Sequence, residues 1–125
     1  MAIVGLGTDI VEIGRLERLS PPVLQRLAQR VLTPTELAQF HEHKQPVRFL
    51  AKRFAAKEAA AKALGTGIGS GVSFQHLVIS NNALGAPQLT LSEGALDRLQ
   101  LLGGSGALLT IADERHYAVA TVILS

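Results

Sequence analysis

The sequence predicts an α+β domain with an antiparallel sheet. Patterns typical of helices lie mainly in the first half of the chain, and patterns typical of strands dominate the second half. Such segregation favours an α+β fold over an α/β fold, in which helices and strands alternate. The length of 125 residues is typical of one domain, so we expect residues 1–125 to fold as a single unit.

Helix caps, breakers and hydrophobic periodicity place the individual elements. Prolines suit the first turn of three predicted helices. Thr33 and Glu36 have the spacing of a capping box, and Gly65 ends the longest helix. In chain order, the predicted elements are a strand over 2–13, helices that begin at 21, 34 and 46, strands over 72–80 and 88–91, a short helix between 92 and 102, and a hairpin of 107–112 with 117–124.

Amino-acid composition excludes several classes of function. The chain has no cysteine, which excludes disulfides, thiolate metal sites and cysteine nucleophiles. Residues 1–6 carry no basic side chain, so we expect no signal peptide, and the apolar segment 117–124 is too short to span a bilayer. We therefore expect a cytoplasmic protein with no membrane partner. A net charge of +2 favours anionic partners without choosing among nucleic acid, nucleotide and acidic protein.

Asp9 is a polar residue in an apolar strand. Strand alternation places its side chain on the same face as Ile3, Val11 and Ile13. A carboxylate on such a face is costly unless it is paired or bound to a metal. The alternative interpretation is an aspartate that caps a turn at the end of a strand.

Two cations lie where apolar side chains are expected. In the helix over 48–64, phenylalanine, leucine and alanine side chains gather into one apolar arc at helical spacing. Arg53 and Lys57 fall inside that arc. Buried cations need anionic partners, which come either from the protein or from a ligand.

The opposite face of this helix combines small and charged side chains. Ala51, Ala55 and Ala59 allow another segment or a ligand to come close. Glu58 and Lys62 are four residues apart and share this face. Such a pair is either a solvated surface ion pair or part of a site.

A glycine-rich loop over 65–71 follows the helix. It lacks the Gly-Lys-Ser/Thr of a Walker motif, and it follows a helix, whereas a Rossmann fingerprint opens one. Its backbone amides can wrap a phosphate. The simpler interpretation is a helix C-cap with a flexible turn.

Together these segments closely resemble the bacterial holo-[acyl-carrier-protein] synthases, the small group of 4′-phosphopantetheinyl transferases. The resemblance covers nearly the whole chain. It rests on Gly-Leu-Gly-Thr-Asp-Ile-Val-Glu-Ile at 5–13 and on Arg-Phe-Leu-Ala-Lys-Arg-Phe-Ala-Ala-Lys-Glu-Ala-Ala-Ala-Lys-Ala at 48–63, continued at 65–68 and joined by a looser match at 82–87. The order and spacing of the first two motifs make them highly specific together.

The resemblance implies both a reaction and an architecture. The reaction is the transfer of 4′-phosphopantetheine from coenzyme A to a serine of apo acyl carrier protein. It releases 3′,5′-ADP, depends on Mg²⁺ and supports fatty acid biosynthesis. The implied fold is that of the 4′-phosphopantetheinyl transferases, with a long helix packed on the antiparallel sheet. The implied assembly is a homotrimer with active sites between subunits.

The resemblance also assigns roles to individual residues. Asp9 and Glu58 fall on the two metal ligands, Lys62 on the lysine that binds the pyrophosphate, and Arg53 on a residue that approaches the nucleotide phosphates. The residues expected to bind coenzyme A further along the chain are Gly65, Thr66, Gly67, Asn82, Gly85 and Pro87.

The chain departs from many relatives in the last hairpin. They carry a histidine in its turn, and the equivalent position here is Ala112 or Asp113. Asp113 is therefore a catalytic candidate beside Glu58 and Lys62. Three general bases stay open, namely a metal-bound water, Glu58 acting through water, and Asp113.

Arginines follow the first strand closely. The family meets an acidic carrier helix with basic residues in this segment, which implies docking on Arg15 and Arg18, with Arg26 as a weaker candidate. The alternative interpretation is a solvated basic surface without a partner.

Two other functional classes fit parts of the sequence. A nucleic-acid-binding module would use the cations of the helix over 48–64, but they spread around the helix and aromatic residues are few. We therefore expect no nucleic-acid partner. A non-catalytic oligomeric protein would use the alanine face for packing, but it leaves Asp9 unexplained.

Overall fold

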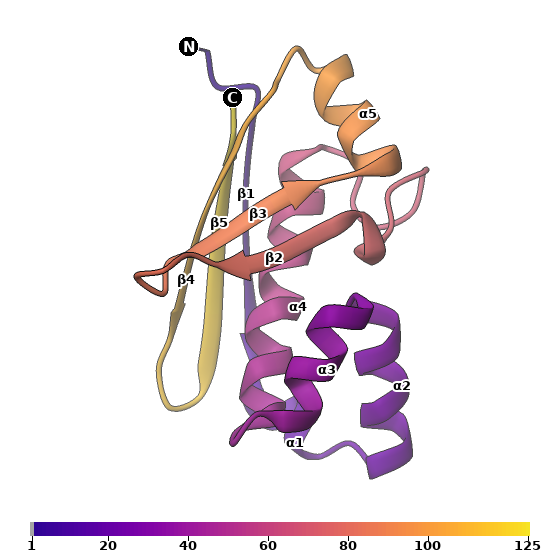
Figure 1. Cartoon of the computed structure of the whole chain (residues 1–125), viewed down its shortest axis with the longest axis vertical. Coiled ribbons are helices and arrows are strands. Elements are labelled where there is room, and N and C mark those ends of the chain that lie inside the picture. Colours follow the sequence, from indigo (N-terminus) through magenta and orange to yellow (C-terminus); the bar gives the residue numbers. More distant parts are fainter. Residues whose placement is uncertain (1) are drawn as a thin grey trace.

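A three-stranded antiparallel sheet forms one layer of the structure, and α4 packs against it (Figure 1). The computed structural model describes residues 2–125. The expected α+β class and antiparallel sheet are confirmed. The elements are β1 (Gly5–Glu12), α1 (Ile13–Glu17), α2 (Pro21–Val31), α3 (Pro34–Glu42), α4 (Pro46–Ala63), a 3₁₀ helix (Phe74–His76), β2 (Leu77–Asn81), β3 (Pro87–Leu91), α5 (Glu93–Leu101), β4 (Ala107–Asp113) and β5 (Tyr117–Leu124).

The order of the strands sets the two edges of the larger sheet. β5 lies in the middle, with β1 on one side and β4 on the other. β2 and β3 form a separate hairpin, in which β2 contacts α4 and β3 contacts β4. α2 and α3 also contact α4 (Figure 1). The long helix is therefore enclosed between the sheet and the two shorter helices.

Local signals of the sequence account for most element boundaries. The capping box at the start of α3 is present in full, because Thr33 Oγ1 accepts from the amide of Glu36 and the Glu36 carboxylate accepts from the amide of Thr33. Gly65 follows α4 with a φ of 79°, a backbone conformation that favours glycine.

Two predicted strands are shorter in the structure. The strand expected over 2–13 ends at Glu12, because Ile13 begins the five-residue helix α1 and buries its side chain with that of Leu16. The strand expected over 72–80 begins only at Leu77. Ser73 accepts a hydrogen bond from the amide of Gln75 and so caps the 3₁₀ helix that precedes it.

β1 and α4 approach each other unusually closely. A Cβ atom at Gly7 would lie 2.1 Å from the carbonyl oxygen of Ala59, and one at Gly5 would lie 2.2 Å from that of Ala63. Only glycine opposite a small helix residue permits this distance. The expected role of the alanine face is confirmed at Ala59, because another segment of the chain does come close. β1 is thereby held beside the turns of α4 that carry the charged residues.

The buried cations of α4 have an anionic partner. Glu36 of α3 is fully buried, and its carboxylate lies 2.7 Å from Lys57 Nζ and 3.6 Å from Arg53. Lys57 also donates to the carbonyl oxygens of Val31 and Phe74. Burial lowers the pKa of Lys57, and the Glu36 carboxylate acts against this shift. Over residues 2–125, no buried side-chain polar atom lacks a hydrogen-bond partner.

Membrane-spanning helices are absent from the part of the chain that the structure describes. None of its helices is both long and apolar enough to cross a bilayer.

Candidate active site

Asp9 lies on the face of β1 that contacts α4. Its side chain lies on the same face of β1 as Gly7 and the side chain of Val11, as strand alternation predicts, and Asp9 is in register with Ala120 of β5. Its Oδ1 atom lies 2.8 Å from Lys62 Nζ, which also donates to the carbonyl oxygen of Thr8 at 3.0 Å. Asp9 is therefore paired within a strand and does not cap a turn.

Glu58 lies one helical turn before Lys62 on α4 and is partly buried. Burial raises its pKa, the Asp9 carboxylate raises it further, and Lys62 and Arg30 act in the opposite direction. The two carboxylates are thus close enough to repel each other. Within residues 2–125 the ion pair of Lys62 joins it to Asp9 and not to Glu58, so the expected helix pair is replaced by a pair between helix and strand.

The two carboxylates suit a hard divalent cation. Mg²⁺ is usually held by one or two carboxylates, with waters and substrate phosphates as further ligands. Asp9 and Glu58 supply that number, and no cluster of three or more acidic, histidine or cysteine side chains occurs in the described chain. The donor set therefore fits Mg²⁺ and does not fit a metal that needs several histidine or cysteine ligands.

A pocket of about 460 Å³ opens beside these residues, which we call the carboxylate pocket. Asp9, Glu58 and Arg15 provide its charged groups, and the other lining side chains are apolar. They are Ile10, Val11, Leu16, Leu19, Leu27 and Phe54. The carboxylate pocket thus combines an acidic pair, one cation and an apolar lining from β1, α1, α2, α4 and the segment between α1 and α2.

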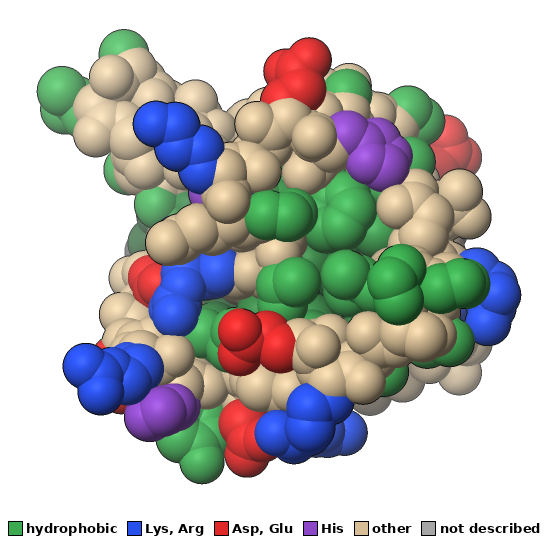
Figure 2. All heavy atoms as spheres, turned by 90° about the horizontal axis from the view of Figure 1, so that it is seen from below, with side chains coloured by type: hydrophobic (Ala, Val, Ile, Leu, Met, Phe, Trp, Pro, Cys, Tyr) green, Lys and Arg blue, Asp and Glu red, His purple; other side chains and the backbone are tan. Residues whose placement is uncertain are grey.

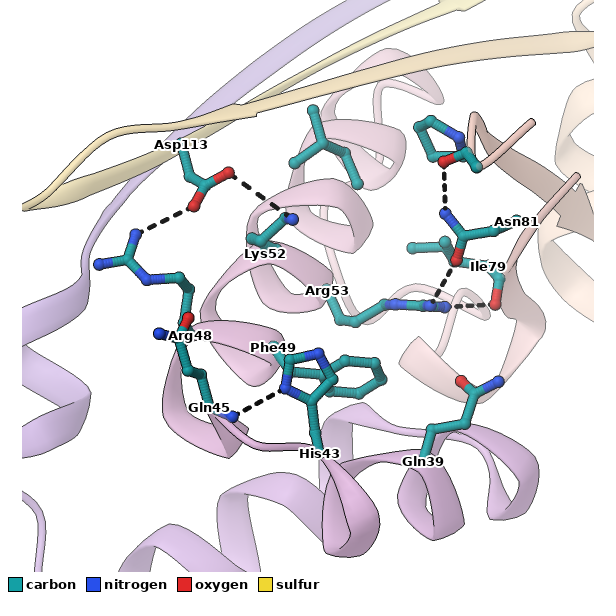
Figure 3. Close-up of a pocket in the computed structure, with 13 residues that line it drawn as sticks. Gln39, His43, Gln45, Arg48, Phe49, Lys52, Arg53, Ile79, Asn81 and Asp113 are labelled. Atoms are coloured by element: carbon teal, nitrogen blue, oxygen red, sulfur yellow. Dashed lines mark hydrogen bonds and ion pairs between the residues drawn. The ribbon is translucent and has the colours of Figure 1, made fainter.

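A second pocket of about 630 Å³ is lined by Arg48, Lys52 and Arg53 (Figure 3), and we call it the basic pocket. Arg48 Nη1 lies 3.0 Å from Asp113 Oδ2, and Lys52 Nζ lies 3.6 Å from Asp113 Oδ1. Arg48 also donates to the carbonyl oxygens of Glu114 and Arg115. It therefore fixes the turn between β4 and β5 to α4.

Arg53 forms the inner wall of the basic pocket. Its guanidinium donates to the carbonyl oxygen of Ile79 and to Asn81 Oδ1, and Asn81 in turn donates to the carbonyl oxygen of Gly85 (Figure 3). Burial lowers the pKa of Arg53, and Glu36 acts against this shift. Arg53 thus holds the turn between β2 and β3 in place.

The structure divides the predicted site residues into groups. Asp9, Glu58 and Lys62 come together at the carboxylate pocket, and Arg15 lines it as well. Arg18 is exposed and pairs with Glu12 at 2.9 Å. The predicted residues that line the basic pocket are Arg53, Gly85, Pro87 and Asp113.

The remaining predicted residues line neither pocket. Thr66 donates to the carbonyl oxygen of Gly67, within the loop where Gly65 ends α4. Asn82 caps the turn between β2 and β3, because its Oδ1 atom accepts from the amides of Leu84 and Ala86. These residues shape the backbone around the pockets.

Among the residues of the basic pocket that sequence reasoning missed are Arg48, Lys52 and Asn81. Arg48 and Lys52 are four residues apart, a spacing that places them on one helix face and could have indicated a shared anion. Asn81 lines the pocket where Asn82 was expected, and the sequence offers no signal that separates the two.

The two pockets lie at opposite edges of the sheet. Asp9 is on β1 and Asp113 is on β4, with β5 between them, and the pockets share no lining residue. The catalytic candidate Asp113 therefore does not face the Asp9 and Glu58 carboxylates of its own chain.

Comparison with known proteins identifies the class. Residues 5–122 match the 4′-phosphopantetheinyl transferase superfamily model. The holo-[acyl-carrier-protein] synthase of Shewanella frigidimarina is 64% identical over 124 residues, which span 99% of this chain and 98% of that protein. The crystal structure of the synthase from Neisseria meningitidis has a TM-score of 0.90 and 44% identity, with 99% of both chains covered. That of the Helicobacter pylori synthase, in complex with coenzyme A, has a TM-score of 0.82 and 32% identity, covering 96% of this chain and 99% of that one.

The fold and the sequence are thus those of a transferase. The chain belongs to the 4′-phosphopantetheinyl transferase superfamily and, within it, to the holo-[acyl-carrier-protein] synthases.

Proposed function

We propose that this enzyme transfers 4′-phosphopantetheine from coenzyme A to a serine of apo acyl carrier protein in a Mg²⁺-dependent step, releases 3′,5′-ADP and so supports fatty acid biosynthesis. The observation that carries the proposal is the convergence of Asp9, Glu58 and Lys62 from β1 and α4. This set provides carboxylates for a metal and an ammonium for a phosphate. The coenzyme A complex of the Helicobacter pylori relative supports the choice of donor.

The transfer reaction requires fixed positive charge beside the diphosphate of coenzyme A. The serine hydroxyl attacks the phosphorus on the pantetheine side, and negative charge builds on the oxygen that leaves with 3′,5′-ADP. Mg²⁺ held by Asp9 and Glu58 would polarise the diphosphate and offset that charge. Lys62 extends from the same helix turn and would donate to the phosphates, where a preorganised cation stabilises the transition state.

Among the possible bases, the site favours Glu58. Its carboxylate lies in the carboxylate pocket beside Asp9, where it could accept the serine proton through a water. Asp113 is already engaged by Arg48 and Lys52 in the other pocket. As a catalytic group it would have to act on the site of a neighbouring subunit.

The basic pocket would bind the nucleotide part of coenzyme A. Arg48, Lys52 and Arg53 supply cations for its phosphates, and Gly85 and Pro87 lie in the wall. In this proposal the loop of Gly65, Thr66 and Gly67 and the Asn82 turn help to enclose the same molecule. Because the two pockets of one chain are separate, a complete site would combine the carboxylate pocket of one subunit with the basic pocket of the next.

An apolar sheet face supports the proposed homotrimer. The face turned away from α4 carries two apolar rows on either side of a threonine row, and its aliphatic side chains Leu6, Ile10 and Leu108 are 66%, 62% and 68% exposed. Contiguous exposed apolar surface of this kind typically marks an interface. A ring of three subunits closes when one edge of the face meets the other edge of its neighbour.

Arg15 and Arg18 are the proposed docking residues for the acidic carrier protein. Arg15 lines the carboxylate pocket, so an acidic partner that contacts it brings its serine close to Asp9 and Glu58. Arg26 is exposed on α2 and would be a weaker contact. The end of the molecule that carries α1 and α2 shows apolar side chains across its middle and charged side chains around them (Figure 2). Such a surface suits an amphipathic acidic segment.

The direct test is incubation with Mg²⁺, coenzyme A and an apo carrier protein, followed by mass spectrometry of the carrier. We expect the carrier to gain one phosphopantetheine. The variants Asp9→Ala and Glu58→Ala should abolish transfer while they stay folded, and Lys62→Ala should lower turnover far more than Lys44→Ala on the exposed loop before α4. A carrier of unchanged mass would contradict the proposed reaction, and full activity of either carboxylate variant at low Mg²⁺ would contradict the metal assignment.

A further inference from the structure

Lys62 donates to the Asp9 oxygen that a metal ion would need as a ligand. Its ammonium lies 2.8 Å from Asp9 Oδ1 and is steadied by the carbonyl oxygen of Thr8 at 3.0 Å. The Asp9 side chain is only 17% exposed, whereas that of Lys62 is 52% exposed. The carboxylate is therefore fixed in the wall of the site, and the cation that neutralises it can move out into water.

A lysine ammonium and a divalent cation compete for Asp9 Oδ1. At ligand distances from one oxygen the two cations would lie within a few ångströms of each other, where their repulsion is strong. A divalent cation that takes Asp9 Oδ1 therefore weakens the hold of Lys62 on this oxygen. The flexible four-carbon stem and compact charge of Lys62 allow it to move away.

We propose that Lys62 is an internal counter-ion of Asp9 that a divalent cation displaces, and that the displaced ammonium then binds the diphosphate of coenzyme A. This inference rests on the proposed role of Asp9 and Glu58 as metal ligands. The exchange couples the two binding events, because the metal releases the ammonium that the diphosphate needs. Coupling of this kind is reciprocal, so coenzyme A must also strengthen metal binding.

The exchange predicts opposite effects of Lys62 in two states of the enzyme. Without coenzyme A, the lysine competes with the metal, so Lys62→Met should bind the metal more tightly. With coenzyme A present, wild type gains affinity through the coupling and the variant should gain much less. Lys62→Arg keeps a cation in place and should stay close to wild type in the metal-only state.

The experiment measures Mn²⁺ binding to the full chain by electron paramagnetic resonance and by calorimetry, with no carrier protein present. Wild type, Lys62→Met, Lys62→Arg and the matched control Lys44→Met are titrated with and without coenzyme A. Binding of Mn²⁺ to coenzyme A alone is measured and subtracted. Asp9→Asn and Glu58→Gln establish which part of the signal belongs to the carboxylates.

We expect Lys62→Met to tighten metal-only binding by roughly 3–10-fold, the range for loss of a partly exposed ion pair and its repulsion. Lys44→Met should change nothing. Unchanged or weaker metal-only binding by Lys62→Met would overturn the exchange, while a loss of binding in Asp9→Asn would leave the proposed metal site standing. If Asp9→Asn and Glu58→Gln both bind Mn²⁺ as wild type does, the metal site and the exchange both fail.

Discussion

The Lys57 ammonium lies 2.7 Å from the Glu36 carboxylate, and both side chains are withdrawn from water. The same carboxylate accepts from the amides of Thr33 and Ile79 and lies 3.6 Å from Arg53. One acidic group thus ties α3, α4 and β2 together. Lys57 directly precedes Glu58, so this network fixes the helix turn that carries the proposed metal ligand.

Removal of the buried charge should be costly. Glu36→Gln leaves Lys57 and Arg53 without their counter-ion, and breaking a buried pair on one side typically costs about 3–5 kcal/mol. We expect a loss of that size in the free energy of unfolding, measured by urea denaturation. Glu42→Gln, an exposed change near the end of the same helix, is the control and should alter stability by less than about 0.5 kcal/mol. Equal stability of the two variants would contradict the network.

Close contact between β1 and α4 gives a second prediction. In Gly7→Ala the new Cβ atom would lie 2.1 Å from the Ala59 carbonyl oxygen, so strand or helix must shift. Overpacking of this kind costs about 1–3 kcal/mol, and the shift moves Asp9 relative to Glu58. We expect a lower Tm and weaker Mn²⁺ binding in the same variant. Gly106→Ala, whose nearest contact would be 3.6 Å away, is the matched control and should keep both values.

Local chemistry explains what the sequence could predict. The capping box of Thr33 and Glu36 and the end of α4 at Gly65 depend on residues within a few positions, and both occur as expected. Asp9 was also singled out correctly as a carboxylate on the inner face of a strand. Periodicity further indicated that Arg53 and Lys57 need an anionic partner, and Glu36 meets that need.

Pairing across the fold could not be predicted in the same way. The Glu36 of the capping box also neutralises Lys57, which is 21 positions away. Helical spacing predicts that Lys62 pairs with Glu58 one turn earlier, but its partner is Asp9, 53 positions away. Asp113 at the end of β4 lies beside Arg48 of α4, 65 positions away, and periodicity does not determine the order of strands.

Glu58 gives a prediction for the pH dependence of stability. Folding raises the pKa of Glu58, so the folded state favours its protonated form. The contribution of Glu58 to stability therefore falls as the pH rises from the ordinary pKa of a glutamate through the raised pKa. In EDTA, Glu58→Gln should therefore be more stable than wild type at neutral pH. The difference should stay below about 1 kcal/mol, since the side chain is partly exposed, and vanish at acid pH. Thermal melts over a pH series measure it, and a constant difference at every pH would contradict the assignment.

The shared site can be tested by mixing two inactive variants. Asp9→Ala disables the carboxylate pocket, and the double change Arg48→Ala with Lys52→Ala disables the basic pocket. If a complete site combines pockets from two subunits, random co-assembly restores about a quarter of the sites. We expect transfer activity to reappear when the two chains are co-expressed or refolded together, and not when separately assembled proteins are combined. If the co-assembled mixture stays inactive, the proposal that a site combines pockets from two subunits is wrong.

The arginines of α1 give the last prediction. Arg15 lines the carboxylate pocket, whereas Arg18 is already paired with Glu12. Arg15→Glu should therefore raise the KM for the carrier more than Arg18→Glu, by about tenfold at low salt, because charges at a docking rim act mainly on encounter. Glu12→Gln frees Arg18 and should lower that KM. Steady-state kinetics over a salt series would test these changes, with Arg115→Glu on the β4–β5 turn as the control. If the KM for the carrier changes neither in Arg15→Glu nor with the salt concentration, the docking surface lies elsewhere.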